Sequence, residues 1–188
     1  MVFELVRRIL PQDSIMLESC SDCHVTLPKL HDTAPTHRYI GGSASCWDQF
    51  SWLNNAGEPP VAAGRYNALL IDAYCVQHHG TPIPPAINSV AVHGIALYAA
   101  LEMGMRLEKA VWVRQFSTFG ADGKKHGQFV WLTPPDQHGC ITINDIVTQP
   151  TPEARVEMLD NYVLDVWATW KAAHLNVFAD WYDRFVVS

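Results

Sequence analysis

The sequence is short of basic residues, and this shortage narrows the classes of partner that the protein can bind. Lysine and arginine together number 13 against 19 acidic residues, which gives a formal net charge of -6. Domains that bind nucleic acid, or that are held to an anionic membrane, carry a basic surface. We therefore expect neither nucleic acid nor membrane as a partner, and an unidentified small molecule or protein in their place.

Long apolar runs are also missing. No stretch approaches the roughly 20 apolar residues that a transmembrane helix needs. The N-terminal stretch MVFELVRRILPQDS is not typical of a signal peptide, because its basic pair follows a short apolar run. These absences predict a cytoplasmic protein. In that reducing compartment, five cysteines indicate metal binding or redox chemistry rather than a disulfide framework.

The sequence does contain enough apolar material for one packed domain. Its 188 residues are 48% hydrophobic and include seven tryptophans, which suits a domain with a sizeable core. We predict a single domain over residues 1–188 with a mainly α fold, arranged as a helical bundle. A Cys-rich metal knuckle is expected at the N-terminus, and a small β-hairpin before the C-terminal helix.

Three segments organise the predicted domain. Residues 18–60 form a Cys-containing loop and a short helix. Residues 64–104 form a central helical hairpin, because two apolar helical stretches are separated by the helix-breaking run TPIPP. Residues 152–186 form a long C-terminal helix, which Thr151 caps and Pro152 begins. Strand composition in QFVWLTPP and CITINDIVTQ predicts the β-hairpin.

The spacing of the cysteines predicts a metal site. Cys20 and Cys23 form a C-x-x-C pair, which lets two thiolates reach one metal ion from a tight turn. Cys46 falls in the first turn of the short helix, where the helix dipole favours a thiolate. A histidine is expected to complete a tetrahedral site, with His78 as the first candidate and His93 as the alternative. We predict one Zn²⁺ per chain.

Other interpretations of the C-x-x-C pair stay open. It also suits a thioredoxin-like redox site, although such a site needs a strand before it and a helix after it. Two unrelated free thiols are a further interpretation, because a single C-x-x-C is a moderate signal.

A second group of polar residues lies on apolar helix faces. Asp72 and His93 stand at similar distances from the turn near Pro82, so an antiparallel helical hairpin places them at similar heights. His174 lies on the apolar stripe of the C-terminal helix and is expected to face the core. We hypothesise that Asp72, His93 and His174 meet as an acid–base cluster, with the carboxylate orienting one imidazole. Alternatively, each is satisfied separately.

The order of these motifs resembles a known bacterial family. The runs CSDC, RYIGGSASCWDQF, LLIDAYCVQHHG, SVAVHGIAL and WATWKAAHLNV follow one another from about Cys20 to Trp181. Together they are similar to the domain-of-unknown-function family five-nine-four-six. The resemblance implies a small, mainly helical cytoplasmic protein with a metal site, and it implies no reaction.

Two classes of function are consistent with these features. In the first, zinc is structural and the function lies in a binding surface or pocket. The alternative is a metalloenzyme, hydrolase-like or biosynthetic, in which a zinc-bound water works with Asp72, His93 or His174. Three cysteines favour the structural role, because closed thiolate-rich sites leave no open position. A third possibility is a bundle that houses a small molecule among its tryptophans and histidines.

Overall fold

The computed structural model describes residues 16–55, 65–106, 109–119 and 129–187. Two segments discussed above lie outside the described residues. They are the N-terminal stretch MVFELVRRILPQDS and residues 56–64, at the predicted boundary between the first two segments. In chain order the elements are β1 (Leu17–Ser19), β2 (Thr26–Pro28), α1 (Ala44–Asn55), α2 (Arg65–Gln77), α3 (Pro84–Leu101), α4 (Ala110–Phe119), α5 (Ile143–Val147), α6 (Pro152–Tyr182) and a final π-helical turn, Asp183–Val187.

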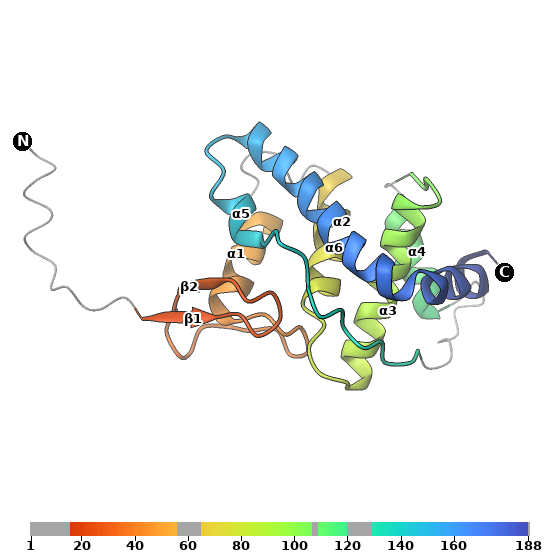
Figure 1. The fold of residues 1–188 in the computed structure, drawn as a ribbon, viewed down its shortest axis with the longest axis horizontal. Helices are drawn as coiled ribbons and strands as arrows, with labels where there is room; N and C mark the ends of the chain where they lie inside the picture. The colour runs from red at the N-terminus through yellow and green to blue at the C-terminus, as the bar shows by residue number, and fades with distance from the viewer. Residues whose placement is uncertain (1–15, 56–64, 107–108, 120–128, 188) are drawn as a thin grey trace, which may run out of the picture.

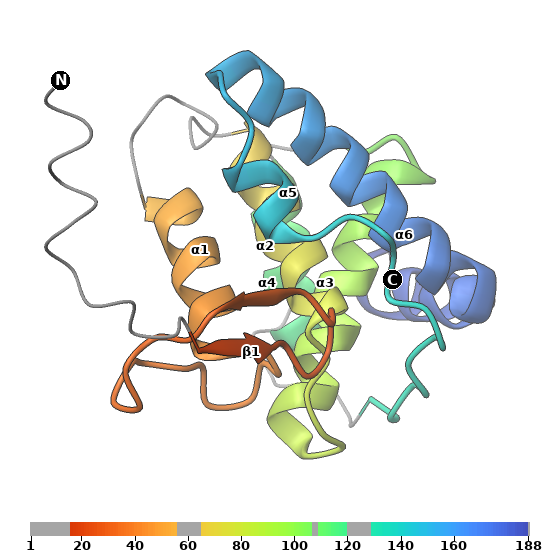
Figure 2. The same cartoon turned by 60° about the vertical axis from the view of Figure 1, so that its left-hand side comes forward.

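The fold is mainly α, as predicted. Helices α2 and α3 form the central hairpin, and the turn between them ends where Pro84 and Pro85 occupy the first positions of α3. Helix α6 begins as expected, because the Thr151 side chain accepts a hydrogen bond from the amide of Ala154. Figure 2 shows α1 and the β-hairpin on one side of the molecule, α6 on the other, and the α2–α3 hairpin between them.

Helix α3 is the centre of the core. By length and composition alone, Pro84–Leu101 is apolar enough to cross a membrane. Its apolar side chains are instead packed against α2, α4 and α6, and Ile95 and Leu97 are fully buried. Gly94 allows α6 to approach closely, because a Cβ atom at this position would collide with the ring of Phe178. Core packing therefore accounts for the hydropathy of α3.

The β-hairpin predicted before the C-terminal helix is wrong in position. The described residues 129–142 form no regular element, and CITINDIVTQ contributes the short helix α5 instead of a strand. The physical reason is a capping box, in which Thr142 and Asp145 satisfy each other's backbone N–H groups. This local arrangement prevails over the alternation of apolar and polar residues that predicted a strand.

The hairpin that does form encloses the C-x-x-C pair. Strands β1 and β2 pair antiparallel, with Leu17 opposite Pro28 and Ser19 opposite Thr26. The hairpin lies beside α1 at the N-terminal side of the molecule (Figure 1). The predicted Cys-rich knuckle thus lies in the turn at the tip of this hairpin, and the loop that follows β2 leads into α1.

Candidate functional site

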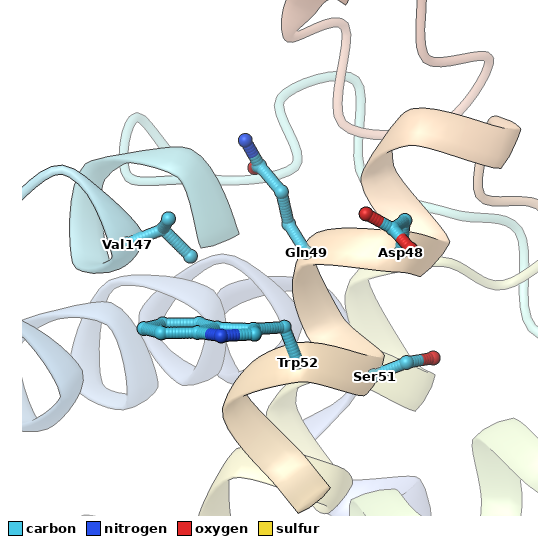
Figure 3. Close-up of a pocket in the computed structure, with 5 residues that line it drawn as sticks. All are labelled: Asp48, Gln49, Ser51, Trp52 and Val147. Atoms are coloured by element: carbon cyan, nitrogen blue, oxygen red, sulfur yellow. The ribbon is translucent and has the colours of Figure 1, made fainter. Parts of the chain in front are cut away.

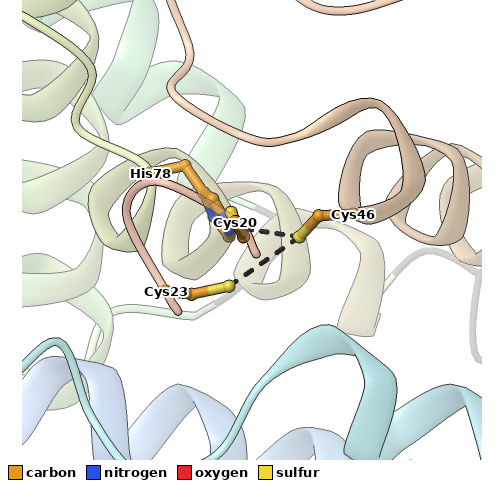
Figure 4. A group of neighbouring side chains, drawn as sticks. All are labelled: Cys20, Cys23, Cys46 and His78. Atoms are coloured by element: carbon orange, nitrogen blue, oxygen red, sulfur yellow. Dashed lines mark hydrogen bonds between the residues drawn. The ribbon is translucent and has the colours of Figure 1, made fainter. Parts of the chain in front are cut away.

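Four side chains converge in a buried cluster that can hold a metal ion. Cys20, Cys23, Cys46 and His78 are all buried, and their candidate ligand atoms all lie within 4.8 Å of one another. The Sγ atoms of Cys23 and Cys46 are 3.9 Å apart, and Cys46 Sγ is 3.3 Å from His78 Nε2. Figure 4 shows the four side chains pointing towards one another from three separate segments. The cysteines are free thiols and form no disulfide.

The hairpin turn brings the first two cysteines together. The amide of Cys20 donates to the carbonyl of Val25, and the amide of His24 donates to the carbonyl of Cys20. His24 has a φ of 60°, a left-handed conformation that closes the turn. No helix follows directly, since β2 begins at Thr26. The context that a thioredoxin-like site needs is therefore absent from this described segment.

The helices supply the other two residues in fixed orientations. Cys46 lies in the first turn of α1, where its backbone amide donates a hydrogen bond to the capping Ser43 Oγ. His78 directly follows α2, and its Nδ1 is 3.0 Å from the carbonyl oxygen of Tyr74. That contact orients Nε2 towards Cys46. The Tyr74 ring stacks on the His78 ring, and its hydroxyl donates to Cys46 Sγ.

A second set of contacts fixes the C-x-x-C turn to the end of α2. Asp22, which lies between the two cysteines, is buried and accepts a hydrogen bond of 2.8 Å from the amide of Gly80. Its carboxylate is also 3.8 Å from His79 Nδ1. The amide of Gly41 donates to the carbonyl of His78. The hairpin, the loop before α1 and the end of α2 therefore meet around the cluster.

Gly80 provides a test of how tightly this junction is built. It has a φ of 67°, and a Cβ atom there would collide with the carbonyl oxygen of Tyr39. Gly104 has a similar φ of 63° but open space around it, so it is a matched control. We expect Gly104→Ala to cost the left-handed strain of about 1–2 kcal/mol, and Gly80→Ala to cost clearly more. If denaturant unfolding shows the same loss of free energy of unfolding for both variants, the backbone around Gly80 must shift to make room for the Cβ atom.

The electrostatics of the cluster favour a thiolate at Cys20 beside a charged imidazole at His78, while Cys46 is kept as a thiol. Hydrogen bonds with Cys23 and Cys46 hold the pKa of the Cys20 thiol well below its usual range. Its contacts with Cys20 and Cys23 raise the pKa of Cys46. Burial opposes protonation of His78, yet its interactions with Cys20 and Cys23 raise the pKa of its imidazole to about 10. The cluster thus pairs thiolate with imidazolium, and a metal ion would displace the protons.

Asp72 and His93 also meet, at a separate place in the helical body. Asp72 is fully buried, and its Oδ1 accepts a hydrogen bond of 2.6 Å from His93 Nδ1. Arg114 on α4 completes the group, since its Nε and Nη2 donate to the two carboxylate oxygens at 2.8 and 3.1 Å. Arg114 Nη2 also donates to the carbonyl of Ala68. One carboxylate therefore joins α2, α3 and α4.

Two predicted members of these sites lie elsewhere. His174 is half-buried, and its Nε2 contacts the carbonyl oxygen of Thr133 at 2.7 Å. No interaction within the described residues joins it to Asp72 or His93, so the three-residue cluster is wrong and Arg114 stands in place of His174. His93, the alternative fourth ligand, is committed to Asp72, whereas His78 completes the cysteine cluster.

Two cavities lie near these elements. One has a volume of about 380 Å³ and is lined by the first turns of α3 together with residues from two other segments: Tyr39, Pro84, Pro85, Asn88, Ser89, Val92, His93 and Thr118. The other, of about 420 Å³, lies along α1 and is shown in Figure 3. Its wall includes the exposed Trp52, over whose ring Arg155 lies at 5.4 Å. Only the first cavity contains a predicted site residue, His93.

A comparison with protein families gives one match. The model of a family of unknown function, DUF5946, matches residues 18–171. The chain belongs to DUF5946. The matched region contains the whole cysteine–histidine cluster and the Asp72–His93–Arg114 group, while His174 lies beyond it. No curated protein and no solved structure matches the chain.

The sequence interpretation missed three residues that build these sites. Tyr74 carried a usable signal, because it stands four residues before His78 and so lies on the same helix face. The sequence signal for Asp22 was weaker, namely an acidic residue inside the C-x-x-C turn. Arg114 had no sequence signal, because its pairing with Asp72 depends on how α4 packs against the central hairpin.

Proposed function

We propose that the cluster binds one zinc ion per chain and that this zinc is structural. The observation that carries the proposal is the spacing of the donor atoms. On a tetrahedral zinc ion with Zn–S distances of about 2.3 Å, two thiolates stand about 3.8 Å apart, and a thiolate and an imidazole nitrogen about 3.5 Å apart. The corresponding distances are 3.9 Å for Cys23–Cys46 and 3.3 Å for Cys46–His78.

The composition of the cluster supports a structural role. Three sulfur donors and one nitrogen donor supply the four ligands that closed zinc sites use, which leaves no position for a substrate. The ligands come from the β-hairpin, from α1 and from the end of α2. A bound ion would therefore clip the N-terminal hairpin and α1 onto the helical body, and the function would lie in a surface or pocket of that body.

The test is the metal content and coordination of the purified protein. We expect one zinc per chain by elemental analysis. X-ray absorption should show three sulfur ligands and one nitrogen ligand, with no bound water. A metal-free protein of full stability would contradict zinc binding, and a site with a water ligand would contradict the structural role in favour of the metalloenzyme.

The acid–base pair belongs to a different site from the metal cluster. Asp72 lies on α2 and His78 directly follows that helix, six residues further on. On a continued helix this separation corresponds to about 9 Å along the axis and to different sides of the helix. His93 faces the cavity at the start of α3 and has Asp72 as its partner. We infer that this pair serves a ligand in the cavity and does not act on a zinc-bound water.

A further inference from the structure

We propose that Cys23 and Cys46 form an oxidation site, at which a peroxide joins their sulfur atoms in a disulfide and opens the metal cluster. The release of metal rests on the proposed zinc binding, whereas the pairing of the two cysteines rests on their geometry alone. The inference adds a reversible, redox-controlled state to a cluster whose closed form is structural.

The two sulfur atoms are already neighbours. Cys23 Sγ and Cys46 Sγ are 3.9 Å apart, and both residues are free thiols. Figure 4 shows the two side chains pointing at each other, one from the hairpin turn and one from α1. A disulfide bond is about 2.05 Å long, so the atoms must approach by roughly 2 Å. The short hairpin, with three paired residues in each strand, is the segment whose marginal stability allows that movement.

Cys23 is the cysteine of the cluster that an oxidant reaches first. Its exposed fraction is 8%, against 1% for Cys20 and 0% for Cys46. The susceptibility of a cysteine to peroxide follows its thiolate character and its exposure, and all the metal-bound cysteines are thiolates. Cys46 is shielded further, because the Tyr74 hydroxyl donates a hydrogen bond to its sulfur. Cys23 is therefore the sulfur that peroxide oxidises, and Cys46 the one that resolves the product.

The oxidation takes two steps, each of which consumes one proton. The Cys23 thiolate attacks one oxygen of hydrogen peroxide and the O–O bond breaks, which gives a sulfenic acid, S–OH, and one water. The Cys46 thiolate then attacks the sulfenic sulfur, an S–S bond forms, and the hydroxyl group leaves as a second water. The two sulfurs together lose two electrons, which the peroxide gains.

The disulfide changes which segments the cluster holds together. Cys23 lies in the hairpin turn and Cys46 in α1, so oxidation joins these two segments covalently. Only Cys20 and His78 of the cluster keep free donor atoms, and two donors do not complete the four-ligand site that structural zinc uses. The end of α2, which carries His78, thereby loses its link through the metal. Thiols reverse the change by disulfide exchange.

Stoichiometric hydrogen peroxide, added to the zinc-loaded full-length chain, tests the release. We expect two thiols to be lost per chain, the zinc to appear in solution, and peptide mapping by mass spectrometry to find a Cys23–Cys46 cross-link. Dithiothreitol with added zinc should restore the starting protein. The proposal is overturned if the thiols survive, if zinc stays bound after they are lost, or if the cross-link joins a different pair.

Two matched variants test the pairing independently of the metal. Cys20→Ser and Cys46→Ser each remove one thiol from the four-residue cluster, so both weaken metal binding by the loss of one ligand. Cys20→Ser keeps both proposed partners and should still form the cross-link. Cys46→Ser lacks the resolving thiol, so Cys23 should accumulate as a sulfenic acid that dimedone traps. It should give at most about a tenth of the cross-linked product.

Equal cross-linking in the two variants would show that Cys23 pairs with whichever thiol is left, and would overturn the assignment. Both variants carry Cys140→Ser, so that the exposed thiol outside the cluster does not contribute. If the purified protein contains no zinc, the zinc proposal fails by its own test. The cross-linking of Cys20→Ser against Cys46→Ser still decides the pairing in that case.

Discussion

Replacing Cys23 by serine is expected to remove the metal and to lower the melting temperature together. Cys23 is one of the four buried side chains that could hold a metal ion. The binding free energy of a structural zinc is coupled to folding, with values of about 10–16 kcal/mol in zinc-finger peptides. For a chain of this size, each kcal/mol lost lowers the melting temperature by roughly 2–4 °C. We therefore expect a fall on the order of 10 °C or more, with zinc measured in the same preparations.

The two cysteines outside the cluster provide the controls for this experiment. Cys140 is exposed and lies outside the cluster, so Cys140→Ser should keep both the zinc and the melting temperature. Cys75 is buried but is also outside the cluster, so Cys75→Ser should keep the zinc even if packing is altered. A Cys23→Ser protein that is metal-free and as stable as the wild type would refute a structural zinc.

Replacing Asp72 by asparagine is expected to have the second large effect. Asp72 is fully buried and compensates Arg114, whose side chain is 20% exposed. Removing one partner of a buried ion pair costs about 3–5 kcal/mol, because the remaining charge stays buried without compensation. The same change removes the hydrogen bond that holds His93. Denaturant unfolding of the wild type and of Asp72→Asn measures the loss of stability. A loss below about 1 kcal/mol is typical of a surface ion pair and would contradict the prediction.

The pH dependence of stability provides an independent check on this group. The pKa of His93 is raised to about 10 in the folded protein, against about 6.5 in an unfolded chain. Its contribution to stability is therefore complete below about pH 6.5 and is lost as the pH rises through about 10. In Asp72→Asn the pKa should fall, so the difference in stability between the two proteins should narrow with rising pH across this window.

NMR titration of the histidines identifies the residue responsible. We expect the His93 titration to move to lower pH in Asp72→Asn. The His174 titration should be the same in both proteins, because His174 contacts the carbonyl of Thr133 and not the carboxylate. An unchanged His93 titration would mean that the 2.6 Å contact does not govern its protonation.

The elements that local signals specify were predictable from the sequence. Prolines end the turn between α2 and α3, and Thr151 with Pro152 starts α6, so these three helices were predicted close to their observed ranges. The C-x-x-C spacing and a cysteine at a helix start were sufficient to predict three residues of the cluster that could hold a metal ion. The choice of His78 over His93 depends on orientation, which the contact with Tyr74 sets.

The elements that depend on packing or on competing local signals were not predictable in the same way. The α5 segment carries both strand-like alternation and a capping box, and only the folded chain shows that the cap prevails. His174 stands between Trp170 and Phe178 on one helix face, which predicts burial. Both neighbours are buried, but His174 is only half-buried and contacts the carbonyl oxygen of Thr133. Arg114 reaches Asp72 across forty-two positions of sequence, a distance over which no local pattern operates.

The small size of the β-hairpin has a consequence for the order in which the molecule opens. Its two strands pair over three residues each, and an isolated two-stranded hairpin is at best marginally stable in water. Its persistence therefore depends on the cysteine cluster and on the contact between Asp22 and Gly80. The hairpin and the loop before α1 should behave as a separate cooperative unit of low stability. On chelation, their amide hydrogens should exchange with solvent long before those of α3 and α6.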